Sequence, residues 1–433
     1  SLGTGWTADV TGEPFYRDAY SGDTDWLGID DGGRDLPQIV IDAGRRPSDG
    51  PDDAYSDEVA RALPNRWGTE ATTAPVKQSY ALSHGNKFRV FGRDLGVVAA
   101  VTYGAGHDIT HIHKEDNRSW SDLTEYESEV RLGGLANLNL KLADRHTLSF
   151  KNLLGHSAEE SFLTGYKSLN NLIYRHVLEW EEKNQLTSSL GGTHGLPVGG
   201  DVTFDWLVFY NENSAKEPDL RWIDYNIDAN PPVMNINRRH WLDLDEYRRG
   251  VDASLRWRFG DVDRPTALEA GLTLSTRRRH SNHRPYNMGR PVADPTADGR
   301  IFLPPDRIFA PENFKEEFFT LRYQDQFEAS YDGTHASDAY YLMLDAPFDV
   351  MQEEFRLTGG ARIETAQYAV DAYDKGIDAT ISARSRTTDL LPSLNLTYMY
   401  DEWTNVRFAY FGSVNYPDLR ELAAVNSVDL VED

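Results

Sequence analysis

The chain contains no cysteine in its 433 residues. A disulfide framework, a thiolate metal site and a cysteine nucleophile are therefore excluded. It also contains no run that approaches the roughly 20 apolar residues of a membrane-spanning helix, which excludes a helical membrane protein. A transmembrane β-barrel stays open, because each of its strands is apolar on one face only.

Signatures of enzymes are missing as well. The sequence contains no Gly-x-Ser-x-Gly elbow, phosphate-binding loop, zinc-protease helix or dinucleotide fingerprint. Paired carboxylates carry no information about glycoside hydrolysis, because the chain has 69 Asp and Glu residues. A net charge of −25 argues against nucleic acid, whose phosphates would be repelled. We therefore expect neither an enzyme nor a cofactor.

Aromatic residues, in contrast, are abundant, with 22 Tyr and 10 Trp. Such rings gather at the two membrane–water interfaces of transmembrane barrels. A carbohydrate-binding β-protein would be equally rich in Tyr and Trp, so composition alone leaves both classes open.

Alternating hydrophobicity is clearest in residues 390–422. Two runs flank a polar turn at residues 401–405, and in each run apolar and polar residues alternate. A period of two residues is typical of a strand with one apolar and one polar face. The apolar positions here are Leu394, Leu396, Tyr398 and Tyr400, then Val406, Phe408 and Tyr410.

The same alternation recurs along the chain in thirteen strand patterns, the first of them in residues 1–10. Short turns near residues 92, 144, 198, 262, 350 and 402 alternate with long connections, among them residues 104–127, 211–246 and 277–337. Every second connection is short in an up-and-down barrel with short periplasmic turns and long outer loops. The polar faces carry many charges, which a solvated lumen accepts. These patterns predict an all-β, antiparallel, up-and-down transmembrane barrel with Leu138, Leu255, Leu272, Leu396 and Phe408 facing outward.

Three stretches also resemble a known family. The string LPSLNL and the following TNVRFAY and NYPDLREL are similar to the barrel of TonB-dependent outer-membrane receptors. SLGTGW at residues 1–6, TGEPFY at 11–16 and DWLGIDDGGRDLP at 25–37 resemble the start of the barrel in Bacteroidetes-type members.

The resemblance implies TonB-coupled uptake of a scarce, large nutrient such as a siderophore, cobalamin or oligosaccharide across the outer membrane of a Gram-negative bacterium. It also implies a barrel of about 22 strands. We therefore expect residues 1–433 to be the N-terminal part of the barrel, with the plug domain and the C-terminal strands absent and with two free sheet edges. The implied partners are the TonB complex through the plug segment, outer-membrane lipid and lipopolysaccharide, the nutrient, and in some members a surface lipoprotein. A soluble, Trp-rich β-protein that binds or cleaves glycans and a passive porin are the alternatives.

Two groups of residues are candidates for ligand binding. Trp222, Tyr225 and Trp241 are predicted to lie in one long loop, where they would stack on a flat ligand or pack the loop against itself. Arg278 and Arg279 belong to a cationic run at a strand end, which would receive anionic groups or form a plain charged rim.

Metal binding has weaker candidates. His107, His111 and His113 alternate as a strand would require for a two-point grip on a metal, and a polar surface loop is the alternative. Asp30, Asp31 and the acidic residues 49–57 offer oxygen ligands for calcium, but without EF-hand spacing they favour a solvated acidic loop.

Overall fold

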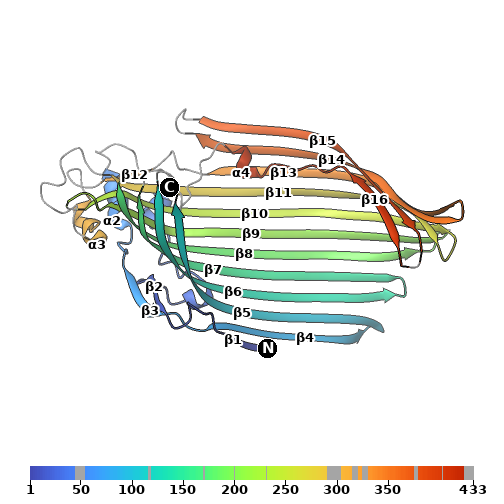
Figure 1. Cartoon of the computed structure of the whole chain (residues 1–433), viewed down its shortest axis with the longest axis horizontal. Helices are drawn as coiled ribbons and strands as arrows, with labels where there is room; N and C mark the ends of the chain where they lie inside the picture. The colour runs from blue at the N-terminus through green and yellow to red at the C-terminus, as the bar shows by residue number, and fades with distance from the viewer. Residues whose placement is uncertain are drawn as a thin grey trace.

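The computed structural model describes residues 1–43, 54–115, 119–168, 171–198, 200–230, 232–289, 304–314, 320–323, 330–374, 379–401 and 403–423. Strands dominate, and the few helices lie at one end of the molecule or near the C-terminus (Figure 1). The strands are β1 (Leu2–Gly5), β2 (Pro14–Asp18), β3 (Thr69–Thr73), β4 (Lys77–Val90), β5 (Arg93–Glu115), β6 (Trp120–Ala143), β7 (His146–Ser168), β8 (Leu172–Leu196), β9 (Asp201–Asn226), β10 (Val233–Gly260), β11 (Pro265–Gly289), β12 (Thr320–Tyr323), β13 (Tyr331–Val350), β14 (Glu353–Asp374), β15 (Ala379–Met399) and β16 (Asn405–Phe411). The helices are η1 (Asp25–Leu27), α1 (Gln38–Ala43), α2 (Ala54–Ala62), α3 (Pro305–Ile308), η3 (Pro311–Asn313) and α4 (Leu419–Leu422).

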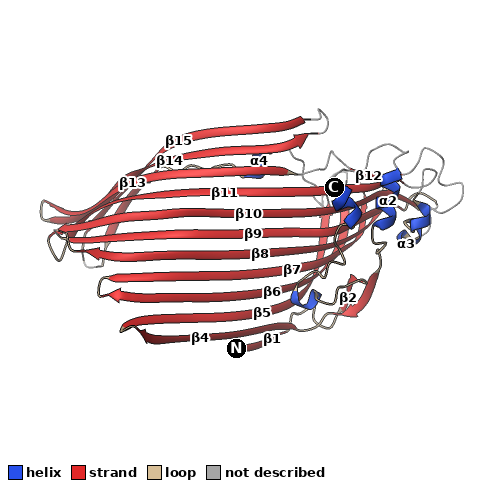
Figure 2. Ribbon diagram, turned by 180° about the vertical axis from the view of Figure 1, so that it is seen from behind, coloured by secondary structure: helices blue, strands red, loops and turns tan. Residues whose placement is uncertain are grey.

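One antiparallel sheet of 14 strands organises the chain. Its main path runs β1-β4-β5-β6-β7-β8-β9-β10-β11-β13-β14-β15-β16, and the short β12 pairs with β11 beside that path. The strands follow one another in sequence order, as Figure 2 shows from behind. Within the described residues the sheet is open, with β1 and β16 at its edges. The predicted all-β, up-and-down architecture is confirmed, and the main path holds the thirteen predicted strands.

The prediction of long loops is largely wrong, because the strands continue through most of the residues assigned to them. β5 extends to Glu115 and β6 begins at Trp120, inside the loop predicted for residues 104–127. β9 and β10 likewise occupy most of residues 211–246, and β11 extends to Gly289. Apolar and polar residues alternate along a strand only where its two faces have different environments. The pattern disappears where both faces are polar or both are covered. The backbone hydrogen bonds of the ladder persist there regardless of side-chain type.

The first predicted strand is shorter than the pattern of residues 1–10 indicated. β1 ends at Gly5, and the chain then turns, with the N–H of Thr11 donating to the carbonyl oxygen of Thr7. Asp9 has a φ of 62°, in the left-handed region that a regular strand does not use.

The register divides the side chains of the sheet between two faces, and the division is the predicted one. We call "first face" the one that carries Leu138, Leu255 and Leu396, and "second face" the one that carries Asn137, Arg256 and Asn395. Direct pairing of Leu138 with Val97 and Phe150, and of Leu396 with Leu357 and Phe408, connects the first face across neighbouring strands.

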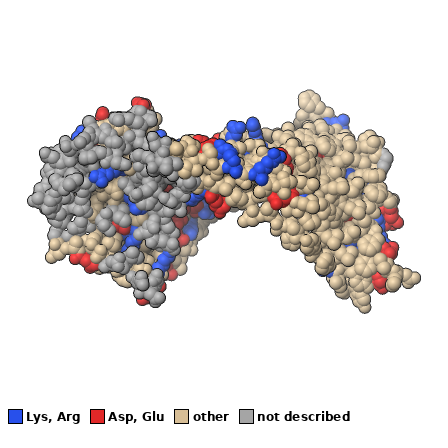
Figure 3. Space-filling view, turned by 90° about the horizontal axis from the view of Figure 1, so that it is seen from above, with Lys and Arg blue, Asp and Glu red and all other residues tan. Residues whose placement is uncertain are grey.

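The first face is itself divided along the strands. We call "turn end" the end with the short connections and "loop end" the opposite one. Toward the turn end, large apolar side chains on the first face are exposed, among them Leu82, Val101, Leu154, Leu255, Tyr340, Leu342, Ile363, Leu390 and Phe408. The largest buried cluster lies at the loop end, where α1, α2, α3 and β12 supply side chains that meet Trp241 and Tyr286 of the sheet. Figure 3 shows that few charged side chains mark the turn end on the side seen there.

Aromatic rings line the first face near the turn end. Phe355 stacks on Phe348 and on Tyr398, with ring centroids 5.5 and 4.8 Å apart, and Trp257 contacts Phe259 at 4.5 Å. Trp403 in the last turn is 90% exposed. Tyr103 and Tyr210, which the sequence pattern places near the ends of their strands, lie well inside them, because β5 and β9 continue far beyond these residues.

Among the described residues, no helix is both long and apolar enough to span a membrane.

Glycines allow close approach of neighbouring strands in this sheet. A Cβ added at Gly360 would collide with the carbonyl oxygen of Leu342 on β13, and backbone cannot move aside without breaking the ladder. At Gly85 the nearest atom would be 3.7 Å away, which is an ordinary contact. We expect Gly360→Ala to lower the free energy of unfolding by roughly 1–3 kcal/mol and Gly85→Ala to leave it nearly unchanged. Thermal unfolding followed by circular dichroism measures both, and equal midpoints would contradict the register of β13 and β14.

Candidate functional site

An irregularity in β9 determines which side chains meet at the loop end. Lys216 pairs with Glu182 of β8 and Arg221 pairs with Leu178. Three residues lie between the two partners on β8, but four lie between Lys216 and Arg221 on β9, so β9 contains one extra residue there. Pro218 has no N–H to donate to the ladder, and Asp219 has a φ of 58°. The bulge re-aims the following side chains, so that Lys216 and Arg221 both lie on the first face.

A buried ion-pair network forms around this bulge. Asp219 accepts two hydrogen bonds of 2.6 Å from Nε and Nη2 of Arg239, in a bidentate arrangement. Arg221 contacts Asp219 at 3.6 Å and also pairs with Asp18 of β2. The side chains of all four residues are at most 5% exposed. Burial lowers the pKa of Arg239, and the carboxylate of Asp219 opposes that shift.

The same side chains hold the described backbone of residues 11–43 and 54–68, which we call the N-terminal segment, against the first face. Arg239 Nη1 donates to the carbonyl oxygen of Pro64 at 2.8 Å, and Arg221 donates to that of Arg66. Trp241 Nε1 donates to the carbonyl oxygen of Arg34 at 2.8 Å. Backbone carbonyl oxygens of the segment that become buried therefore accept hydrogen bonds. These bonds remove the free-energy cost of burying an unsatisfied carbonyl group.

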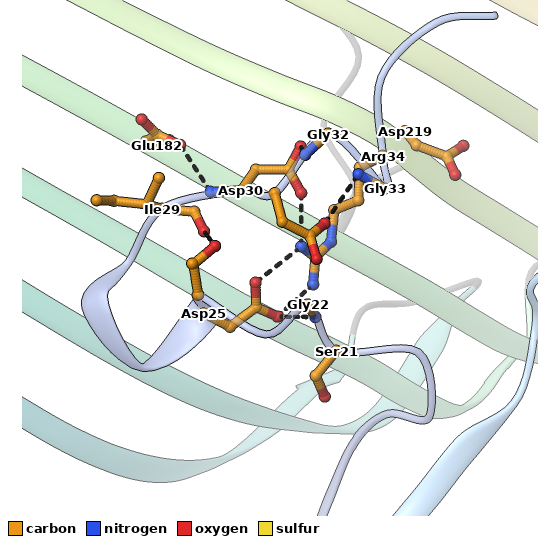
Figure 4. Close-up of polar contacts among 12 residues, drawn as sticks. Ser21, Gly22, Asp25, Ile29, Asp30, Gly32, Gly33, Arg34, Glu182 and Asp219 are labelled. Carbon is orange, nitrogen blue, oxygen red and sulfur yellow. Dashed lines mark hydrogen bonds and ion pairs between the residues drawn. The ribbon is translucent and has the colours of Figure 1, made fainter.

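Arg34 occupies the centre of the acidic turn that was a calcium candidate (Figure 4). Its guanidinium donates to Asp25 at 2.7 and 3.1 Å and to Asp30 at 2.8 Å. Burial lowers the pKa of Arg34, but the two carboxylates outweigh burial and raise it above its usual value. The carboxylate of Asp31 accepts from the backbone N–H groups of Gly33 and Asp23, which lower its pKa. A protein cation therefore fills this turn. Part of the acidic run at residues 49–57 lies outside the described residues.

A cleft of about 870 Å³ opens beside the docked segment. Five tyrosines and one phenylalanine characterise it, and we call it the tyrosine cleft: Tyr16, Tyr20, Tyr126, Phe162, Tyr166 and Tyr174. Tyr16 and Tyr20 belong to the N-terminal segment, whereas the other four project from the first face of β6, β7 and β8. The volume falls within the roughly 300–1,000 Å³ of small-molecule sites.

The rings in the cleft are arranged in two groups. Tyr126 stacks on Phe162 at 6.0 Å, and Tyr16 meets Tyr126 edge-on at 5.2 Å. Tyr166 and Tyr174 form the other group, with centroids 5.5 Å apart. Tyr16, Tyr20 and Tyr166 are 38%, 45% and 47% exposed, so ring surface is open to a ligand.

His176 supplies a polar group to the same cleft. Burial lowers its pKa to about 4, so the imidazole is neutral at neutral pH. Its ring packs edge-on against Phe162 at 4.9 Å. Its Nε2 is buried and has no hydrogen-bond partner among the described residues. The ring therefore forms part of the cleft wall as a neutral group, and the backbone of Trp67 is a hydrogen-bond partner of its imidazole.

The structure does not bring Trp222, Tyr225 and Trp241 into one loop, because they lie in β9 and β10. Trp222 is 1% exposed on the second face, where Arg175 covers its ring at 4.3 Å and Asp224 accepts from its Nε1 at 2.8 Å. Trp241 is 3% exposed on the first face. Tyr225 packs against the same cluster as Trp241. These rings stabilise the protein interior and offer no common surface.

Arg278 and Arg279 lie on opposite faces, as neighbours in a strand must. Arg278 is exposed on the first face, 3.3 Å from the hydroxyl of Tyr247. Arg279 lies on the second face and pairs with Glu246 at 2.6 Å and with Asp418 at 2.7 Å. Asp418 precedes α4, so this arginine attaches the C-terminal segment to the sheet.

His107, His111 and His113 share the first face of β5 but no metal geometry. His107 packs edge-on against Phe15 at 5.3 Å, and burial lowers its pKa. His111 Nδ1 lies 3.1 Å from the hydroxyl of Thr124. Within the described part of the chain, no group of three or more potential ligands is arranged to hold a metal ion. Asp116, which the sequence places beside them, lies outside the described residues.

The second face carries a row of carboxylates at the loop end. Glu129, Glu159 and Glu181 lie directly opposite one another on β6, β7 and β8. Arg131 pairs with Glu129 and Lys183 with Glu181. Burial and the neighbouring carboxylates raise the pKa of Glu159 to about 7, and burial and its acidic neighbours raise that of Glu179 to about 8.

Sequence reasoning missed the tyrosine cleft because its walls are far apart in the chain. Tyr16 and Tyr166 are separated by about 150 residues, and no local pattern relates them. The one available signal was the abundance of tyrosine, which is compatible with both a membrane interface and carbohydrate binding.

Comparison with known proteins identifies no relative: no protein-family model, no curated protein and no solved structure matches this chain.

Removing one member of a buried ion pair leaves an uncompensated charge. We expect Asp219→Asn to reduce the free energy of unfolding by roughly 3–5 kcal/mol. The control is Glu70→Gln, which breaks the Arg17–Glu70 pair, whose side chains are 45% and 44% exposed. That change should cost about 0–1 kcal/mol. Chemical unfolding measures both, and similar losses would contradict the docking role of the network.

Glu159 makes stability depend on pH. Its pKa is raised from 4.5 to about 7, so the folded chain retains a proton that the unfolded chain has lost. Stability should therefore fall as pH rises from about 4.5 to about 7. Glu159→Gln should raise the unfolding temperature at pH 8 and flatten this decline. The exposed Glu13→Gln is the control for loss of one carboxylate, and an unchanged pH profile in Glu159→Gln would refute the assignment.

Proposed function

We propose that this chain forms part of the wall of an outer-membrane β-barrel receptor that imports a scarce, large nutrient. The observation that carries the proposal is the exposed apolar strip on the first face, which spans neighbouring strands near the turn end and has a charged face behind it. Lipid would cover the strip, and water and the transported nutrient would contact the second face.

The strands offer more length than a bilayer requires. β10 has 28 residues, whereas a tilted transmembrane strand needs about 9–11. Trp257 and Tyr247 lie ten residues apart on the first face of β10, about 33 Å along the strand. At a tilt near 40° this corresponds to roughly 25 Å across the membrane, the usual height of the apolar band. The loop end would then project into the external medium.

The TonB dependence of the proposal rests on the resemblance at residues 1–37 and 390–422. In this interpretation a plug domain contacts the inner-membrane TonB complex, and lipopolysaccharide surrounds the loop end. A surface lipoprotein is a further partner that such receptors use. The polar second face, with a groove of about 350 Å³ near Asp205, Asp252 and Tyr341, supports passage of a polar solute.

Absence of cysteine makes the lipid-facing assignment testable without background labelling. Adjacent single-cysteine pairs, Leu138→Cys with Asn137→Cys and Leu255→Cys with Ser254→Cys, sample the two faces at the same height. In outer membranes, first-face thiols should resist a water-soluble maleimide, and a label there should be quenched by lipid-attached nitroxide. Second-face thiols should show the reverse. A chain that stays monodisperse without detergent, with both thiols equally reactive, would instead be the soluble glycan-binding alternative.

A charge placed in the apolar strip should prevent stable insertion. Leu396→Arg is expected to cost roughly 2–4 kcal/mol if the residue lies near the middle of the bilayer. The neighbouring Asn395→Arg places the same charge on the second face and should cost far less. Unfolding in lipid vesicles compares the two, and equal costs would remove the basis for assigning lipid to the first face.

Energy coupling separates the receptor from a passive porin. Cells expressing the protein are given labelled ferric siderophore, cobalamin or a neutral oligosaccharide in turn. For a TonB-dependent receptor, accumulation stops when a protonophore collapses the proton-motive force or when TonB is deleted. Accumulation that continues under both conditions would favour the porin.

A further inference from the structure

We propose that the tyrosine cleft binds a neutral oligosaccharide of two or three sugar units. The cleft lies on the first face at the loop end, on the opposite side of the sheet from the charged second face. The inference is therefore separate from the uptake proposal, and either can fail without the other.

Open aromatic faces are the first argument. The faces of the exposed Tyr16 and Tyr166 rings carry the negative charge of the ring quadrupole, whereas the guanidinium of Arg66 lies over the Tyr20 ring at 5.6 Å. The axial C–H groups of a pyranose ring carry partial positive charge and present a flat apolar surface, so they stack on such rings. Two separate groups of rings match a ligand with more than one stacking unit.

Polar groups between the rings are the second argument. The hydroxyl of Thr164 bonds with that of Tyr174 at 2.9 Å and reaches the carbonyl oxygen of Arg175 at 3.1 Å. Asp122 and Asp306 contribute carboxylates to the lining. Alternating donors and acceptors beside aromatic rings suit the hydroxyl groups of a sugar.

Charge decides against an anionic ligand. The lining contains two aspartates and neither lysine nor arginine, so acidic sugars or phosphates would be repelled. A quaternary ammonium group would also favour aromatic rings and carboxylates. However, a single such group is far smaller than a cleft of about 870 Å³, which favours the larger neutral ligand.

The cleft is held open by the docking network. Asp18 lies between Tyr16 and Tyr20 in the sequence and is fixed from both sides, through Arg221 and through Glu160, which accepts from its backbone N–H at 2.7 Å. The carboxylate of Asp18 also accepts from the N–H of Tyr20 at 3.0 Å. Both tyrosines are thus positioned before a ligand arrives, which reduces the entropy lost on binding.

Calorimetric titration of the purified chain with maltotriose, cellotriose and mannotriose tests the proposal. A polyoxyethylene detergent is used, because a maltoside headgroup would compete. At least one trisaccharide should bind, and Tyr16→Ala and Tyr166→Ala should each weaken it about tenfold, which is about 1.4 kcal/mol. Tyr16→Phe keeps the ring and should bind nearly as well as the natural chain.

The control is Tyr340→Ala, which removes an exposed tyrosine of the first face far from the cleft and should leave binding unchanged. Circular dichroism verifies folding, and Tyr166, at the rim, serves if Tyr16→Ala does not fold. The proposal is overturned if none of the three sugars binds, or if both alanine variants bind as tightly as the natural chain. Binding of tetramethylammonium or trigalacturonate in place of the neutral sugars would overturn it as well.

Discussion

The antiparallel hydrogen-bond ladder is the constraint on which the rest of this molecule depends. Because side chains alternate across each strand, thirteen strands paired in sequence order produce two faces with independent compositions. One face exposes aliphatic side chains near the short turns, and the other carries arginines and carboxylates over the same length. A slip of one residue would exchange the two sets, so the register is also what gives each face its chemistry.

The same ladder explains why most of the buried side chains lie at one end. A single layer of strands buries little by itself, and at the turn end the apolar side chains of the first face have no covering layer among the described residues. At the loop end the N-terminal segment supplies that layer together with α3 and β12, and Trp241 and Tyr286 become buried beneath them. The stability of the loop end thus depends on the segments that pack on the sheet. The stability of the turn end depends on the hydrogen-bond ladder and on the medium that contacts the first face.

A one-residue bulge has consequences far beyond β9. Pro218 and Asp219 interrupt the ladder, and the shift gathers Asp219, Arg221 and Arg239 on one face. Their charges are tolerated without water only because each is paired, and the pairs also satisfy carbonyls of the N-terminal segment. The position of Tyr16 and Tyr20, and with it the shape of the tyrosine cleft, follows from this docking.

The sequence by itself determined the class of fold, the number of strands in the main path, the positions of the short turns and the division of residues such as Leu138 and Asn137 between two faces. These are local properties, since a period of two residues and the composition of a tight turn act over a few positions. Only the tertiary structure decided how far strands such as β5 and β10 extend, because the ladder continues where alternation ends. It also decided that Arg34 fills the acidic turn, that Trp222 and Trp241 are buried on opposite faces, and that Tyr16 meets Tyr126. Those outcomes depend on contacts between segments distant in the chain and on one bulge that reverses the faces of β9, and neither leaves a periodic trace in the sequence.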